Sequence, residues 1–153
     1  MGQQQLLLIV LGVIIVGIAI AVGISMFKSN AVSSNRDQVI NDLNNLAAKA
    51  QQYWRKPTSM AGGGQDFAGF WLTTSDTGNA NGSYAVVSQA PTAGTFANFT
   101  HSTGTAADSV TGGPGVTTMY ITGQGTEIGN NGTNPVEVTV TVTPNSTQAV
   151  VQN

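Results

Sequence analysis

The sequence has no cysteine among its 153 residues, which excludes disulfide bonds and thiolate metal sites. Its single histidine, His101, stands in a polar segment without a carboxylate pair nearby, as is typical of a surface histidine. The seven carboxylates are scattered, and no two have the spacing of a general acid and base. We therefore expect no catalytic residue, no metal site and no cofactor, and we do not expect an enzyme.

Charge is also scarce, since charged residues make up 8% of the chain. In residues 1–56, five basic residues against two aspartates give a net charge of +3. Residues 57–153 hold five acidic residues and no Lys or Arg, so they carry −5. The small overall charge of −2 does not indicate nucleic-acid binding.

The segment from Gln3 to Phe27 has no charged residue at all. As a helix, the 22 residues from Leu6 to Phe27 would rise roughly 33 Å, which matches the ~30 Å of bilayer hydrocarbon. A signal peptide would have a basic start and a shorter apolar core. Lys28 follows the span, and the positive-inside rule would then place the C-terminal side in the cytoplasm. The polar second half of the chain is instead typical of an exterior domain, so a simple single span does not account for the whole pattern.

The helix is predicted to continue beyond Phe27, because residues 31–54 contain neither Gly nor Pro. One apolar stripe runs along this half at helical spacing. Its members are Val32, Val39, Leu43, Leu46, Ala50 and Tyr53. Asp42 and Lys49 fall on other faces, where we expect them to be exposed. Pro57 ends the pattern, so residues 1–56 are predicted to form one helix with an apolar half (1–27) and an amphipathic half (28–56).

Residues 57–153 are predicted to form a β-rich head. Segments 83–88, 117–122 and 135–143 have the composition of strands, and an Asn-Gly turn within 130–135 would join the last two as a hairpin. In the last strand, valines alternate with Glu137 and threonines, which predicts one buried face and one solvated face. Phe67, Phe70 and Trp71 are expected to cover the helix stripe. Residues 76–83 approach the spacing of an EF-hand loop, but Thr77 holds the first ligand position, so a turn-rich loop is favoured. The fold class is α+β.

A long helix with an apolar, projecting first half and a second half packed on a small antiparallel head resembles the type IV pilin superfamily. Met1 is a residue with which mature pilins begin, and cleavage of a leader is expected before Met1 or after Gly2. The family usually has a glutamate at the fifth mature position, whereas this chain has Gln5, which keeps hydrogen-bonding capacity without the charge. Gly17, Ala21 and Ser25 recur every fourth residue and would let helices approach closely. Gly12 and Gly23 are positions where helical hydrogen bonds could open.

The resemblance implies a subunit that polymerises with copies of itself into an extracellular filament on the cell surface. Before assembly it would reside in the inner membrane, in contact with lipid, prepilin peptidase and the assembly machinery. The residues expected in the filament core are Met1, Gln5, Leu6, Leu11, Gly12, Val16, Gly17, Ile20, Ala21, Gly23 and Ser25. Two alternatives stay open: a pseudopilin of a secretion or DNA-uptake system, and a single-span membrane-anchored binding domain.

Four Asn-X-Ser/Thr sequons lie in the head, in segments predicted as turns or loops. They begin at Asn81, Asn98, Asn131 and Asn145. They are candidate glycosylation sites on an exterior surface, and a chain this rich in Asn, Ser and Thr also forms such motifs by chance.

Overall fold

The computed structural model describes residues 2–87, 109–110, 112–129 and 132–152. Within these residues the chain forms one long α-helix, a short 3-10 helix and a five-stranded sheet. The elements are α1 (Gly2–Arg55), η1 (Thr58–Met60), β1 (Gly78–Asn79), β2 (Gly82–Val87), β3 (Met119–Ile128), β4 (Pro135–Val142) and β5 (Thr147–Val151). The predicted α+β class is confirmed.

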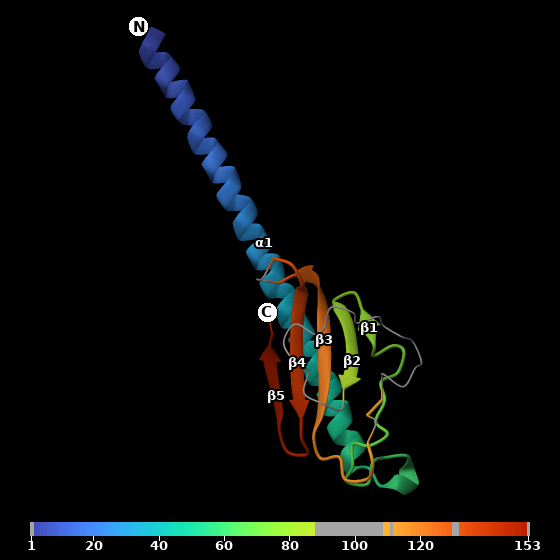
Figure 1. The fold of residues 1–153 in the computed structure, drawn as a ribbon. Coiled ribbons are helices and arrows are strands. Elements are labelled where there is room, and N and C mark those ends of the chain that lie inside the picture. Colours follow the sequence, from blue (N-terminus) through green and yellow to red (C-terminus); the bar gives the residue numbers. More distant parts are fainter. Residues whose placement is uncertain (1, 88–108, 111, 130–131, 153) are drawn as a thin grey trace.

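The sheet is an antiparallel meander in the order β1-β2-β3-β4-β5, so each strand pairs with its neighbours in the sequence. The second half of α1 passes behind this sheet, while the first half projects far beyond it (Figure 1). The end of β5 lies near the point where α1 leaves the head (Figure 1). One layer of helix therefore covers one face of the sheet, and the first half of the helix has no packing partner among the described residues.

The core lies between the second half of α1 and the inner face of the sheet. Val39 and Leu43 of the helix are fully buried, as are Ile121 of β3 and Val140 of β4. The sheet residues that line this face come from alternate positions because successive side chains of a strand point to opposite faces. They include Tyr84, Val86, Met119, Ile121, Val138, Val140 and Val142, all buried.

The loop after α1 folds back onto the end of the helix. The carbonyl oxygens of Tyr53 and Lys56 accept hydrogen bonds from the N–H groups of Gly63 (2.8 Å) and Gly64 (2.9 Å). A Cβ on Gly63 would lie 1.8 Å from the main-chain oxygen of Asp66, so only glycine fits there. The two glycines therefore bond one carbonyl in the last turn of α1 and one directly after its end, where main-chain acceptors need partners from outside the helix.

The expected aromatic cover of the helix is formed by two of its three predicted members. Phe67 and Phe70 are buried, and their rings lie against Trp54 (centroids 4.7 Å apart) and Tyr53 (5.5 Å). Trp71 was wrongly predicted, because it is 64% exposed. It lies between the buried Phe70 and Leu72 in extended chain, where alternation turns the intervening side chain outward.

The predicted hairpin is confirmed, since β3 and β4 pair antiparallel with a register shift between Gln124 and Ile128. Gly132 in the connection has φ 71, a conformation that favours glycine. The solvated outer face predicted for β4 is wrong, because Glu137 and Thr139 are 2% and 4% exposed. β4 is a central strand between β3 and β5, so its outer side chains have neighbours on both sides.

Candidate functional site

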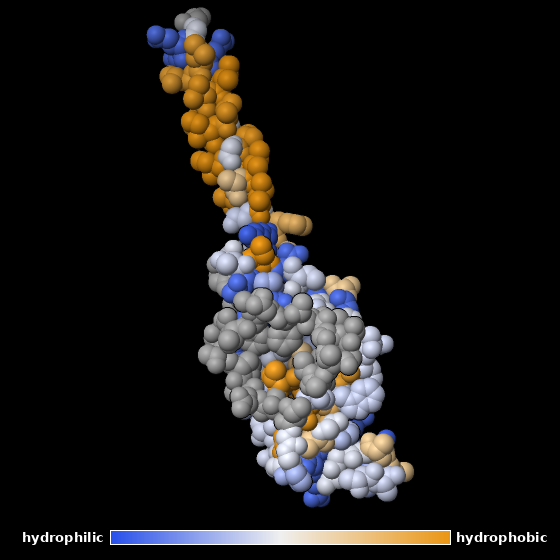
Figure 2. Space-filling model, turned by 45° about the vertical axis from the view of Figure 1, so that its right-hand side comes forward, coloured by the Kyte–Doolittle hydropathy of each residue, from blue (hydrophilic) through white to orange (hydrophobic). Residues whose placement is uncertain are grey.

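The first half of α1 is an exposed apolar rod. Leu6 is 64% exposed, Ile14 52% and Phe27 78%, and every described residue before Ala31 is exposed. Figure 2 shows this part of the molecule as a continuous hydrophobic surface outside the head. By its length and composition α1 could cross a membrane. A helix that is apolar all round is stable only when lipid or protein covers it.

The residues expected in the filament core lie on this rod. Met1 falls outside the described residues, and all the others are exposed positions of α1. They are Gln5, Leu6, Leu11, Gly12, Val16, Gly17, Ile20, Ala21, Gly23 and Ser25. The helix is continuous through Gly12, Gly17 and Gly23, and a Cβ at any of the three would meet nothing within 4 Å.

The residues expected to attach the helix to the head lie between α1 and the sheet. Val32, Val39, Leu43, Leu46 and Ala50 are buried, and Tyr53 is partly buried against the same core. Tyr53 also donates its hydroxyl to the main-chain oxygen of Ala68 at 3.1 Å. The second half of α1 therefore has its apolar stripe covered within the chain, unlike the first.

A buried polar residue, Asn35, interrupts this apolar stripe. Its Nδ2 donates to the main-chain oxygen of Asn81 at 3.0 Å, and its Oδ1 accepts the N–H of Glu127 at 3.4 Å. Asn35 is 6% exposed, so its amide is compensated by hydrogen bonds to both β3 and the β1–β2 turn. These directional contacts set the position of the helix along the sheet.

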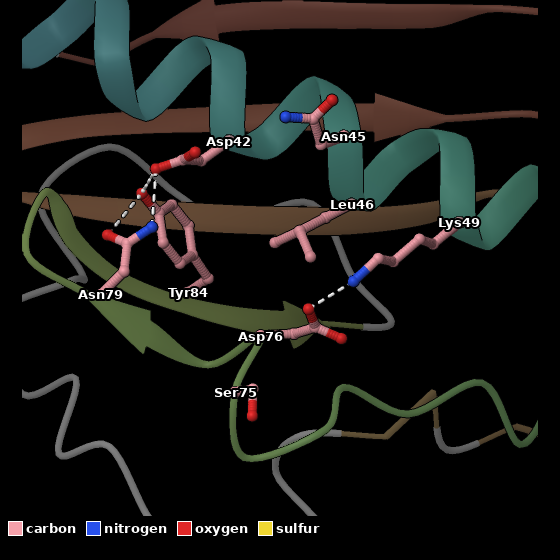
Figure 3. Close-up of a pocket in the computed structure, with 8 residues that line it drawn as sticks. All are labelled: Asp42, Asn45, Leu46, Lys49, Ser75, Asp76, Asn79 and Tyr84. Carbon is pink, nitrogen blue, oxygen red and sulfur yellow. Dashed lines mark hydrogen bonds and ion pairs between the residues drawn. The ribbon is translucent and has the colours of Figure 1, made fainter.

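A second polar contact joins α1 to the β1–β2 turn at Asp42 (Figure 3). Asp42 Oδ2 accepts hydrogen bonds from Asn79 Nδ2 (2.8 Å), Asn81 Nδ2 (2.9 Å) and the Tyr84 hydroxyl (2.6 Å). Burial alone would raise the pKa of Asp42, but the hydrogen bonds from Asn81, Tyr84 and Asn79 outweigh it and the pKa lies below its usual value. Asp42 is thus half-buried and engaged, and its predicted exposure is wrong.

Lys49, about two turns further along α1, forms an ion pair with Asp76 on the loop before β1 (Figure 3). Burial tends to raise the pKa of Asp76, whereas the Lys49 ammonium and the Thr73 hydroxyl lower it more. Asp42, Lys49, Asp76, Asn79 and Tyr84 line a hollow of about 110 Å³. Asp42 bonds to Asn79 and Tyr84, and Lys49 pairs with Asp76, so the polar groups of the hollow are engaged with one another (Figure 3). We call these five residues the clamp, because they hold the helix against the head.

Asp66 joins two loops at the other end of the head by hydrogen bonds to their main chains. Its carboxylate accepts the N–H groups of Ala68 (2.8 Å), Gly115 (2.7 Å) and Val116 (2.9 Å). The hydrogen bonds from Ala68 and Gly115 keep the pKa of Asp66 below its usual value. This carboxylate therefore connects the segment that precedes β3 to the loop that follows α1.

The candidate glycosylation sites are in different surroundings. Asn81 holds Asp42 through Nδ2 and accepts from Asn35 through its main-chain oxygen, so its amide is already bonded. Asn145 lies exposed in the β4–β5 turn. Asn98, Asn131 and His101 lie outside the described residues. Among the described residues, no group of three or more His, Asp or Glu side chains could hold a metal ion.

Sequence reasoning missed the roles of Asn35, Asp42 and Asp66. Asn35 carried a usable signal, because an amide at the helical spacing of Val32 and Val39 falls on the buried stripe and needs partners. Asp42 and Asp66 bond to segments that are distant in the sequence, and no local period announces such contacts. Comparison with known proteins adds nothing here, since no protein-family model, curated protein or solved structure matches the chain.

Proposed function

We propose that the chain is a structural subunit that polymerises with copies of itself into an extracellular filament of the type IV pilus kind. In this filament the apolar halves of α1 pack together in the core and the polar heads form the outside. Before assembly, the apolar half resides in the inner membrane, where prepilin peptidase and the assembly machinery act on the chain.

The observation that carries the proposal is the contrast between the two halves of one continuous helix. The second half buries its stripe in a complete core, whereas the first half exposes apolar side chains on every side. Burial of apolar surface stabilises by roughly 25 cal/mol per Å², so this rod is unstable in water without a cover. Lipid supplies that cover before assembly, and identical helices supply it afterwards.

The composition of the rod supports contact between copies. It has no charged side chain that would need a partner in a dry core, and Gln5 is neutral where the family usually has a glutamate. Gly17, Ala21 and Ser25 form a strip of small side chains four residues apart, all exposed, along which another helix can approach closely. The head, in contrast, satisfies its clamp residues internally and leaves a polar exterior.

A second candidate is a membrane-anchored domain that stays a monomer. It is favoured by the ability of α1 to cross a membrane by length and composition. The two candidates differ in whether copies of the apolar rod contact one another.

The test is to shear surface material from cells that express the chain and to examine it by negative-stain microscopy and intact mass. The proposal expects thin helical fibres whose dominant band has the mass of this chain after leader removal. A chain found only as a dispersed monomer in the membrane fraction would support the anchored domain. Short, scarce fibres that never accumulate at the surface would instead indicate a pseudopilin.

A further inference from the structure

A hollow of about 200 Å³ lies where the apolar rod meets the head. Its helix side is formed by Ser25, Lys28, Ser29 and Val32, and its other side by Ile128, Gly129 and Gly132 around the β3–β4 connection. The four helix residues are spaced by three, one and three positions, so they share one face of α1. The hollow therefore stands beside the helix at the first charged residue after the rod.

The lining combines a cation and two hydroxyls with an apolar floor. Lys28 is exposed. Among the described residues the ion pair is the one between Lys49 and Asp76, so no carboxylate pairs with Lys28 in that part of the chain. Val32 is 5% exposed and Ile128 43%, which gives the floor its apolar character. An ammonium and hydroxyl groups bind a phosphate through charge-assisted hydrogen bonds, while the floor favours an apolar body attached to it.

The position of this hollow along α1 favours a membrane lipid as the source of a bound phosphate. If the rod spans a bilayer, the 22 residues from Leu6 to Phe27 occupy roughly 33 Å, against ~30 Å of hydrocarbon. Lys28 then lies just outside the hydrocarbon, at the level of the lipid headgroups. Figure 2 shows hydrophilic residues directly after the apolar surface of α1, before the head begins.

We propose that this hollow binds the phosphate of an anionic phospholipid while the chain resides in the membrane. The inference rests on the membrane stage of the proposed function. It also gives Lys28 a role on the outward side of a span, where the positive-inside rule disfavours a lysine. Assembly into a filament then has to release this lipid together with the rod.

The test uses the full chain with ¹⁵N-labelled lysine in phosphatidylglycerol vesicles, and it measures ¹⁵N–³¹P dipolar dephasing by solid-state NMR. The chain has three lysines, and Lys28→Gln assigns the signal of interest. We expect strong dephasing of the Lys28 ammonium, from a nitrogen–phosphorus distance of about 4 Å. Lys49 lies in the second half of α1 and Lys56 directly follows its last residue, so both are distant from the rod and should show little dephasing.

Two matched variants separate a built site from a lysine that merely reaches the membrane surface. Ser29→Leu fills the hollow and keeps Lys28, so it should remove most of the dephasing. Ser34→Leu makes the same change at an exposed position outside the hollow and should leave the dephasing unchanged. Equal dephasing in both variants would overturn the site.

The same chain is also measured in micelles of a detergent without a phosphate group, with inorganic phosphate added. If the Lys28 ammonium dephases there as strongly as in the vesicles, the assignment to a lipid is overturned. Vesicle flotation is measured in parallel. A chain that floats with vesicles but shows no dephasing refutes this inference alone, whereas a chain that does not float refutes the membrane stage of the proposed function as well.

Discussion

Asn35 of α1 and Gly125 of β3 approach so closely that a Cβ on the glycine would lie 2.1 Å from Asn35 Oδ1. The same amide bonds to Asn81 and to the N–H of Glu127. The absence of a side chain at Gly125 is therefore what allows the helix to lie at this distance from the sheet.

Gly125→Ala should destabilise the head by about 1–3 kcal/mol, because the added methyl displaces a buried, hydrogen-bonded amide. The measurement is denaturant unfolding of the full chain in detergent micelles, followed by tryptophan fluorescence. Gly113→Ala is the control, since a Cβ there meets nothing within 4 Å. Equal stabilities of the two variants would show that Asn35 moves without cost.

Asp42→Asn should change how the stability of the head depends on pH. The pKa of Asp42 is lowered in the folded state, so its stabilising contribution is present above the unfolded value near 3.8 and is lost as pH falls through the folded pKa. The variant cannot ionise, so the stability difference from wild type should be largest near neutral pH, about 1–2 kcal/mol, and shrink in acid. Asp37→Asn, the same change at an exposed position of the same helix, is the control, and an equal pH dependence in the two variants would contradict the assignment to Asp42.

Glu137→Gln should behave in the opposite sense. Burial raises the pKa of Glu137, so the unfolded chain loses this proton more readily and stability falls as pH rises above 4.5. A glutamine keeps hydrogen-bonding capacity without a charge, so its benefit relative to wild type should grow between pH 4 and 7. The same denaturation series measures it, with the exposed Glu127→Gln as control. A benefit that stays constant with pH would contradict the assignment.

Val16→Asp should abolish fibres and membrane residence together. A charge in an apolar core or a bilayer costs several kcal/mol, and Val16 lies in the middle of the rod. Membrane fractionation and microscopy of sheared material measure the two outcomes. Gln38→Asp places the same charge on an exposed position of the second half of α1 and should leave both intact.

Ala21→Leu should separate assembly from membrane residence. The larger side chain keeps the rod apolar, so fractionation with the membrane should not change, but it blocks close approach along the strip of Gly17, Ala21 and Ser25. We expect fibres to be reduced or lost. Ala19→Leu makes the same enlargement at an exposed position on the opposite side of α1 and should affect fibres less. Normal fibres from Ala21→Leu would show that this strip is not a contact between copies.

The sequence predicted the parts of the fold that local patterns determine. The helix could be followed to Arg55 because no Gly or Pro interrupts residues 31–54, and β4 because its valines alternate. The burial of Glu137 could not be predicted, because it depends on which strands lie beside β4. The orientation of Trp71 could not be predicted either, because it depends on whether Trp71 or its neighbours Phe70 and Leu72 enter the core. A strand with one polar face looks solvated until its neighbours on both sides are known.

The same limit applies to the candidate site. The apolar rod is visible in the sequence because its residues are contiguous. The clamp at Asp42 joins positions that are 37 to 42 residues apart, and Asn79, Asn81 and Tyr84 carry no shared motif that points to it. Polar contacts of this kind follow from the helix–sheet register, which is itself a product of the packed core.

The unbroken course of α1 has a mechanical consequence. A pull on the N-terminal end of α1 would be transmitted along the helix axis into the segment that carries Asn35 and Asp42, because the helix is continuous from Gly2 to Arg55. The load then acts as shear on the interface between helix and sheet, where the directional bonds of these two side chains resist sliding. In the proposed filament, the strength of each subunit under tension would thus be determined at its own helix–sheet interface, several turns away from the rod that would contact other copies.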